Sequence, residues 1–379
     1  MSNLRRPEVA TCAALLALLA IERAHPANGL AFVPKALQRE AREWVYHGTN
    51  TEDELGLLAG YYDELLNASR DSTHADAGAL WQKGLNRSNL HEWDRSFLLY
   101  RPLPRLGDPT DPAATHVTSA ERLFDRDYPL ERTPGVRRIA WVGDSLSRGL
   151  GAPFGQALEP RVERWLNATQ AGDGTSGFEV LNLAVEGYRT TQFVRVVEEA
   201  LERFAPDAVL LGLSDLSVTR IWGRHLAALV HDGIDLEYPF LRELAQRARL
   251  APDDAPTVTD QKLAPFADEL VAWALDTMSA RCRERGVALV VALLPAVGEP
   301  RRLDGRFRSA RRLLAERELP TLDLVATFAD VPDLRPWRVS DIDHHPNSAG
   351  YERLFERFVA ELRGTPAAAG ALLGRTAVR

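Results

Sequence analysis

Cysteine is nearly absent from this sequence: Cys12 and Cys282 are the only two in 379 residues. Two thiols cannot form a disulfide framework or a structural zinc site with four thiolate ligands. Lysine is also scarce, and none of Lys35, Lys83 and Lys262 follows the glycine spacing of a Walker-type phosphate loop. The acidic side chains number 53 and the basic ones 46, which gives a formal net charge of −7. The overall field therefore opposes binding to nucleic acid.

A long hydrophobic run is missing as well. The N-terminal run from Val9 to Ile21 carries no charge, but it is shorter than the roughly 17–25 apolar residues of a membrane-spanning helix. With Arg5 and Arg6 before it, the run is typical of the apolar core of a secretory signal. We expect residues 1–25 to be a signal-like or anchoring segment, and the protein to be exported or membrane-anchored on the periplasmic or extracellular side. A buried amphipathic helix in a cytoplasmic protein is the alternative.

Residues 26–134 are predicted to form a helical and irregular N-terminal extension. The stretch from Glu52 to Leu66 repeats leucine and tyrosine at the spacing of one helix face. From Trp93 to Pro134, prolines and aspartates are frequent, which is typical of an irregular connecting segment.

An alternation of strands and helices is predicted for residues 135–364. Short apolar runs bounded by glycine or proline indicate buried strands, and amphipathic stretches between them indicate helices. This alternation predicts a parallel sheet covered by helices on both faces, with ligands bound at the carboxyl ends of its strands. The expected strands are 138–142, 178–183, 208–212, 287–294 and 319–325, and the expected helices include 192–204, 270–285 and 347–362.

Two further segments flank or interrupt this pattern. The long crossover from Ser214 to Pro265 exceeds a plain loop, and it is expected to add a helical layer or, alternatively, a lid over the substrate. Residues 365–379, rich in alanine and glycine, are expected to form a flexible tail.

The first candidate site is Gly143-Asp144-Ser145-Leu146, directly after the first predicted strand. A serine at a strand-to-helix turn exposes its Oγ atom at the edge of the sheet, and the N-terminal amides of the next helix face the same space. This placement suits a nucleophile whose attack generates an oxyanion. The alternative is that Asp144 or Ser145 only caps the helix. The motif differs from the Gly-x-Ser-x-Gly turn of α/β-hydrolases.

The second candidate site is the segment from Asp341 to Gly350, just before the last predicted helix. A serine is a poor nucleophile at neutral pH unless a base removes its proton, and histidine is the usual base. A carboxylate beside that histidine orients the ring and stabilises the imidazolium ion. His344 and His345 lie here with Asp341 and Asp343. A metal site or a cluster at the start of a helix is the alternative, but no set of ligands at metal spacing accompanies the histidines.

Together these motifs resemble the SGNH (GDSL-type) hydrolases, a family of serine esterases and acyltransferases. The resemblance runs from Arg138 to about Leu362 and implies an α/β fold, a flavodoxin-like three-layer sandwich around a central, mainly parallel five-stranded sheet. Segments 61–62 and 124–132 also resemble the leader portion of exported or membrane-anchored bacterial members.

The resemblance assigns roles to individual residues. Ser145 corresponds to the nucleophile, and Gly187, in the second conserved block, corresponds to a residue whose amide helps to form the oxyanion hole. His345 precedes Pro-Asn as the base does in the family, and Asp343 is then its acidic partner. A rival register pairs Asp341 with His344 in Asp-x-x-His spacing.

The third conserved block departs from the family. The family pattern is Gly-x-Asn-Asp, but this chain has Gly-Leu-Ser-Asp, so that Ser214 stands where the asparagine amide donates to the oxyanion. Loss of one oxyanion donor costs roughly 10²–10³ in rate. An active enzyme in which Ser214 assists is therefore one reading, and a binding protein that has lost turnover is the other. A nucleotide-binding protein that uses the Gly143 turn is disfavoured by the missing phosphate-loop pattern.

The leading expectation is a serine-dependent ester hydrolase or acyltransferase that acts on a small-molecule or carbohydrate ester, including O-acetyl groups. It needs no metal and no organic cofactor, and we expect no nucleic-acid partner; the N-terminus is a candidate membrane anchor. Arg148 and Arg189 are expected near the mouth of the site, where they would attract an acidic substrate or remain simply solvated. The sequence makes no prediction of oligomeric state.

Overall fold

The computed structural model describes residues 90–171, 174–218, 223–254, 256–341 and 343–374. The expectations for the signal-like segment and for the Glu52–Leu66 helix lie outside these residues. Within the described ranges, no helix combines the length and the apolar character that a membrane span requires.

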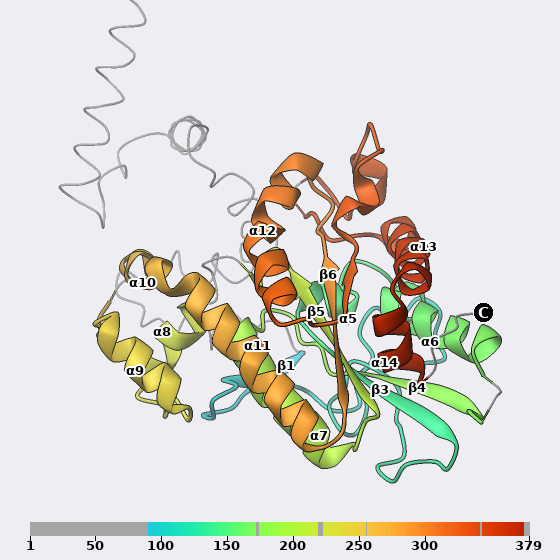
Figure 1. Ribbon diagram of the computed structural model, residues 1–379, viewed down its shortest axis with the longest axis horizontal. Helices are drawn as coiled ribbons and strands as arrows, with labels where there is room; N and C mark the ends of the chain where they lie inside the picture. The colour runs from blue at the N-terminus through green and yellow to red at the C-terminus, as the bar shows by residue number, and fades with distance from the viewer. Residues whose placement is uncertain (1–89, 172–173, 219–222, 255, 342, 375–379) are drawn as a thin grey trace, which may run out of the picture. The chain divides into compact units, whose positions relative to one another are not determined.

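A five-stranded parallel sheet forms the centre of the fold, with strand order β4-β3-β5-β6-β7 (Figure 1). Every neighbouring pair in this sheet is parallel. The middle strands are almost wholly buried, which explains their continuous apolar sequences, because helices cover both faces. The strands are β3 (Val136–Val142), β4 (Gly177–Asn182), β5 (Ala208–Ser214), β6 (Ala288–Leu294) and β7 (Thr321–Asp323).

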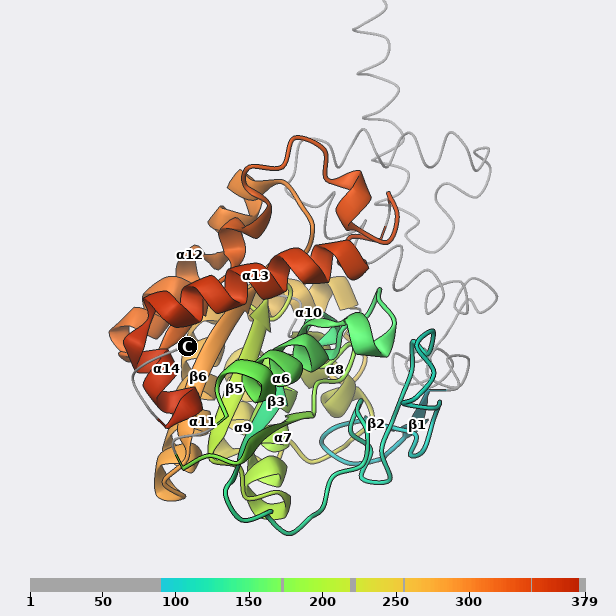
Figure 2. The same cartoon turned by 90° about the vertical axis from the view of Figure 1, so that its right-hand side faces the viewer.

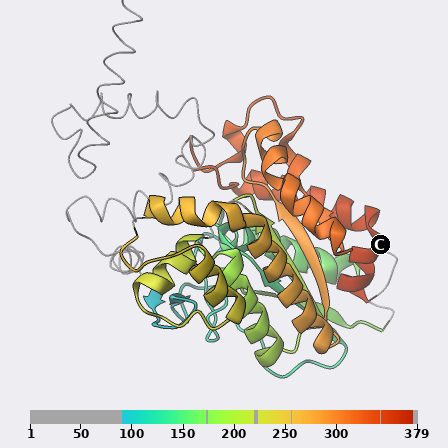
Figure 3. The same ribbon diagram turned by 60° about the vertical axis from the view of Figure 1, so that its left-hand side comes forward.

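Two helical layers complete a three-layer sandwich. On one face lie α6 (Leu158–Thr169), α13 (Ser348–Gly364) and α14 (Pro366–Leu373), in front of the sheet in Figure 2. On the other face lie α7 (Thr190–Arg203), α11 (Ala267–Glu284) and α12 (Pro300–Glu316), which Figure 3 brings forward. This arrangement confirms the expected flavodoxin-like fold with its central parallel sheet.

The residues before the sheet form a strap, residues 90–128, that packs into the same hydrophobic core. Its short strands β1 (His91–Trp93) and β2 (Tyr100–Pro102) pair antiparallel. Aromatic side chains of the strap are buried, including Phe97 between the strands, Tyr100 in β2 and Phe124 after it. The described part of the predicted extension therefore shares its core with the sheet.

The long crossover contributes helices, which agrees with the expected helical layer. These are α8 (Gly223–His231), α9 (Pro239–Arg247) and α10 (Pro256–Leu263), and they precede α11. Leu241 and Leu244 of α9 are fully buried, and Phe240 stacks on Trp273 of α11 with ring centroids 5.0 Å apart.

The expectation of a flexible tail after residue 364 is wrong for residues 366–373. Helix α14 buries Ala368, Ala369, Leu372 and Leu373, because small alanine side chains allow it to approach β5 and β6 closely. Arg137 secures its end by donating to the carbonyl oxygens of Leu372 at 2.6 Å and Ala371 at 2.7 Å. Glycine and alanine therefore indicate tight packing here.

Candidate active site

Ser145 lies at the carboxyl end of β3, as the first residue of the short helix α5 (Ser145–Arg148). Asp144 caps this helix by accepting a hydrogen bond from the Leu146 amide at 3.1 Å. A side chain at Gly143 would come within 2.9 Å of the Gly212 carbonyl oxygen, so only glycine allows the turn to sit this close to β5. The turn leaves Ser145 at the sheet edge where ligands of parallel sheets bind.

His345 and Asp343 come from the loop before α13 and meet Ser145. The Nε2 atom of His345 lies 2.8 Å from the Oγ atom of Ser145. Its Nδ1 atom lies 2.6 Å from an Asp343 carboxylate oxygen, which also accepts the His345 backbone amide at 3.0 Å. Because an ionised carboxylate can only accept, Nδ1 carries the hydrogen and Nε2 is left to accept the serine proton.

The charge of Asp343 is maintained in this position. Burial alone would raise the pKa of its carboxyl group, but hydrogen bonds from His345 and the charge of that ring hold the pKa below its ordinary value. The carboxylate can therefore stabilise an imidazolium ion when His345 takes up a proton.

The residues of the rival register have different neighbours. Arg338 donates to the Asp341 carboxylate at 2.9 Å and lies 3.0 Å from the Nε2 atom of His344. The Asp341 side chain is 78% exposed. The structure thus brings Asp343 and His345, rather than this second pair, into contact with Ser145.

The loop that carries His345 is held in place by hydrogen bonds within the loop, at the start of α13 and from α13 to the segment after α5. Val339 donates its amide to the His345 carbonyl oxygen at 3.0 Å, and Asn347 caps α13 through the amides of Ala349 and Gly350. Tyr351, buried in α13, donates its hydroxyl to the Leu150 carbonyl oxygen at 2.9 Å. The Tyr351 hydrogen bond therefore holds α13, which follows the base segment, against the segment that follows the nucleophile helix.

Two backbone amides are available as oxyanion donors. Among the described residues, neither the Ser145 amide nor the Gly187 amide donates to an acceptor. Gly187 has a positive φ of 79°, which a side chain would strain, and the loop before it is tied to the nucleophile turn by a Val185 to Gly143 hydrogen bond of 3.1 Å. The loop that carries Gly187 thus lies beside the turn that carries Ser145.

Ser214 uses its hydroxyl group within the site's framework. It donates to the Asp144 carboxylate, which also accepts the Ser217 hydroxyl at 2.8 Å. The Ser214 oxygen in turn accepts the Ser217 amide at 3.2 Å. The hydroxyl proton is therefore engaged with Asp144, and the Asp144 carboxylate is held in place as the helix cap.

Arg148 lies on the same short helix as Ser145, but the expectation that Arg148 and Arg189 attract an acidic substrate or are solvated is wrong. Both side chains are buried, with exposed fractions of 6% and 2% for the two residues. Arg148 instead forms an ion pair with Glu186, the residue before Gly187. Sequence reasoning missed this pair, and its only signal was a glutamate inside an otherwise apolar loop.

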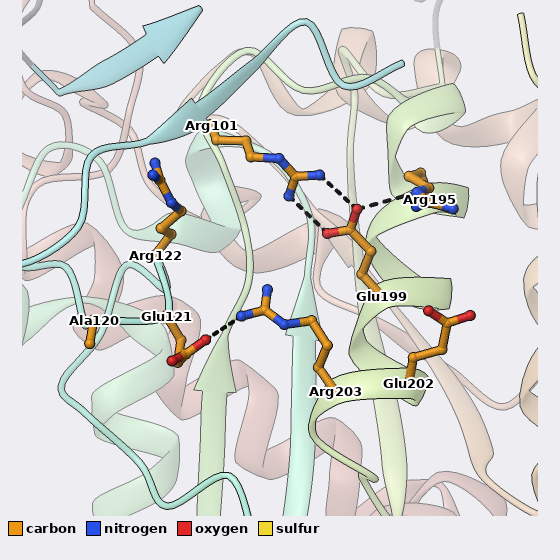
Figure 4. Close-up of a pocket in the computed structure, with 8 residues that line it drawn as sticks. All are labelled: Arg101, Ala120, Glu121, Arg122, Arg195, Glu199, Glu202 and Arg203. Carbon is orange, nitrogen blue, oxygen red and sulfur yellow. Dashed lines mark hydrogen bonds and ion pairs between the residues drawn. The ribbon is translucent and has the colours of Figure 1, made fainter. Parts of the chain in front are cut away.

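A surface pocket of about 420 Å³ lies between the strap and α7, and none of Ser145, His345 and Asp343 lines it (Figure 4). Arg101 forms a bidentate pair with Glu199, with hydrogen bonds of 2.9 and 2.8 Å, and Arg203 forms an ion pair with Glu121. Because Arg101 and Arg203 already face carboxylates, the two ion pairs join the strap to α7. Neither arginine presents a free positive charge to a ligand.

Comparison with known proteins adds independent information. A sequence profile of the GDSL-like Lipase/Acylhydrolase family matches residues 141–353. No match was found among curated proteins.

Solved structures show weak similarity. A structure of TesA is 17% identical, with a TM-score of 0.38 and coverage of 60% of this chain and 99% of that chain. The lipase/acylhydrolase from Enterococcus faecalis is 17% identical, with a TM-score of 0.39 and coverage of 60% and 96%. A catalytic mutant of Axe2, an acetylxylan esterase from Geobacillus stearothermophilus, is 15% identical, with a TM-score of 0.38 and coverage of 60% and 94%.

Proposed function

Because this chain belongs to the GDSL-like lipase/acylhydrolase family of ester hydrolases, we propose that Ser145, His345 and Asp343 are its catalytic triad. The observation that carries the proposal is the 2.8 Å separation between the Ser145 Oγ atom and the His345 Nε2 atom. This separation is within the reach that proton transfer between a nucleophile and its base requires.

The reaction begins when His345 removes the hydroxyl proton of Ser145. The Oγ atom then bonds to the acyl carbon of the ester, and the carbonyl oxygen becomes an oxyanion. The amides of Ser145 and Gly187 donate to this oxygen, and the dipole of α5 adds a weak favourable field. Asp343 keeps the His345 ring oriented and stabilises its positive charge.

Collapse of the tetrahedral intermediate breaks the bond to the alcohol oxygen, and His345 returns its proton to the leaving alcohol. An acyl-enzyme on Ser145 remains. Water, activated by His345, then releases the acid and restores the serine; an acceptor hydroxyl in place of water would make the reaction an acyl transfer. The substrate class that we propose is a small-molecule or carbohydrate ester, and an acetyl ester is its simplest test.

Hydrolysis of p-nitrophenyl acetate tests the proposal. Ser145→Ala is expected to lower kcat/KM by at least about 10³-fold, because a triad serine has no substitute. Ser147→Ala is the matched control, since Ser147 lies on the same helix and its buried Oγ atom has no hydrogen-bond partner among the described residues. Equal rates for the wild type and Ser145→Ala would remove Ser145 from the mechanism.

A second candidate function is a binding protein that has kept the fold and lost turnover. The observation that favours it is Ser214, whose hydroxyl is engaged with Asp144 where the family places an oxyanion donor. A fluorophosphonate probe separates the two functions, because it forms a covalent bond only with an activated serine. Labelling of Ser145 would exclude the binding protein, and no labelling would favour it.

A further inference from the structure

A buried ion pair connects the two turns that supply the oxyanion amides. The Nε atom of Arg148 lies 2.9 Å from an Oε atom of Glu186, and the two side chains are 3% and 6% exposed. Arg148 is the last residue of the helix that Ser145 begins, and Glu186 directly precedes Gly187. The pair therefore links one amide-bearing segment to the other through side chains.

Glu186 is held as a carboxylate from two sides. Burial alone would raise its pKa, but Arg148 and His91 lower the pKa to about 2. The Nε2 atom of His91, in the strap, lies 3.5 Å from the second carboxylate oxygen. The Glu186 carbonyl oxygen accepts the Tyr100 hydroxyl at 2.8 Å, so the strap fixes both the side chain and the backbone next to Gly187.

Arg148 is immobilised on its other faces. Its guanidinium group stacks over the ring of Phe124 at 4.1 Å from the centroid, and it donates to the Nδ1 atom of His116. The Arg148 carbonyl oxygen accepts the Asn182 side-chain amide at 3.4 Å. A guanidinium confined in this way can transmit the position of Glu186 to α5 with little freedom of its own.

The strap that carries His91 and Tyr100 is itself clamped to the sheet domain. The Arg101 to Glu199 hydrogen bonds and the Arg203 to Glu121 ion pair join it to α7 across the pocket in Figure 4. The Glu186 turn is thus enclosed between fixed elements.

We propose that the Arg148–Glu186 ion pair is a positioning device that holds the Gly187 amide in register with the Ser145 amide. An oxyanion donor is effective only when its nitrogen lies about 2.7–3.1 Å from the oxygen that develops charge. With the Ser214 hydroxyl engaged elsewhere, two amides share this task, and the separation between their turns sets the geometry of the hole. The inference rests on the proposed esterase function and extends it to residues that do not touch the substrate.

The test compares Glu186→Gln with Glu179→Gln. The first change removes the negative charge of Glu186 at nearly constant volume and leaves the Arg148 guanidinium without its carboxylate. The control removes the negative charge of Glu179, which is partly buried and pairs with the buried Arg138. Both residues lie near the starts of β4 and β3, at the opposite ends of these strands from Ser145. For each protein, fluorophosphonate titration counts the competent sites, and kcat per site, KM and the inhibition constant of phenylboronic acid are measured.

The proposal predicts that Glu186→Gln lowers kcat per titrated site by about 10- to 100-fold and leaves KM within twofold. The inhibition constant of the boronic acid, which forms a tetrahedral adduct with the serine, should rise by a similar factor. Glu179→Gln should lower thermal stability without changing any of these three values by more than twofold. Values for Glu186→Gln that match those of the control would overturn the proposal.

One further variant and the wild-type result keep the outcomes distinct. Arg148→Lys retains the charge but loses the planar guanidinium group, so it should show the same split between kcat and KM even if Glu186→Gln does not fold; a wild-type kcat for it would overturn the proposal. A wild type that neither hydrolyses the ester nor reacts at Ser145 would instead refute the proposed function, on which this inference depends.

Discussion

The Nε2 atom of His345 lies 2.8 Å from the Oγ atom of Ser145, although 200 positions separate the two residues in the sequence. Ser145 follows β3, an interior strand of the sheet, and His345 precedes α13, which covers one face. Because every strand of the sheet is parallel, the segments that leave their carboxyl ends converge at one edge. The contact is therefore a direct consequence of the topology.

Replacement of His345 should abolish most of the activity. His345→Asn removes the proposed base, and we expect kcat to fall by about 10³-fold or more. His344→Asn is the matched control, because the His344 ring contacts Arg338, whereas the ring beside Ser145 is that of His345; its kcat should stay within about threefold of the wild type. Steady-state kinetics with p-nitrophenyl acetate would check both values, and the reverse ranking would favour the Asp341–His344 register.

The two aspartates of the loop should differ in the same way. Asp343→Asn loses the carboxylate that orients His345, and a fall in kcat of about 10³- to 10⁴-fold is expected. Asp341→Asn removes only an exposed partner of Arg338 and should change kcat by less than about twofold. If the Asp343 variant kept more than a tenth of the wild-type kcat, the proposed orientation of His345 would be untenable.

Removal of the Ser214 hydroxyl should have a modest effect. This hydroxyl donates to Asp144, so Ser214→Ala weakens the cap of α5 but takes no donor from the oxyanion. We expect kcat to fall by less than about tenfold, whereas loss of a true oxyanion donor lowers it by about 10²–10³-fold. A decrease in kcat in the larger range would show that Ser214 assists the oxyanion, as one reading of the sequence has it.

Glu159 is expected to make stability depend on pH. It lies on α6 with a residue exposure of 1%, and burial, followed by the charges of Asp125 and Glu163, raises its pKa well above the ordinary value, against the opposing charge of Arg126. The unfolded chain ionises this group at a lower pH than the native protein. The native state then binds more protons, and this contribution to stability is lost as pH rises above the ordinary glutamate pKa.

Glu159→Gln removes this titration without changing the side chain's volume. Its Tm should match the wild type near pH 4.5 and exceed it at pH 8, where the group is ionised in the unfolded chain. Glu356→Gln, at an exposed position of α13, serves as the control and should follow the wild type at both pH values. Differential scanning calorimetry would check this, and parallel curves for the wild type and Glu159→Gln would contradict it.

The sequence was most informative where the fold is repetitive. The apolar runs of β5 and β6 predicted buried strands because helices cover both faces of the sheet and no alternation is required. At the sheet edge the same reasoning overestimated a strand. The expected strand 319–325 is reduced to Thr321–Asp323, and a 3₁₀-helix, Val325–Phe328, follows it.

The sequence also located the residues that meet at the site, but it did not reveal the framework around them. Local motifs indicated Ser145, His345 and Asp343, whose chemistry depends on residue type and spacing. Burial of Arg148 beside Glu186 depends on the strap, which reaches the site only through tertiary packing. An arginine in a loop sequence looks solvated until its partner is known.

The central claim is that Ser145 is an activated nucleophile, and covalent labelling by a fluorophosphonate with peptide mapping by mass spectrometry tests it most directly. We expect one adduct, on the peptide that contains Ser145, absent in Ser145→Ala and formed much more slowly in His345→Asn. Absence of labelling in the wild type, or an adduct on another serine that persists in Ser145→Ala, would contradict it.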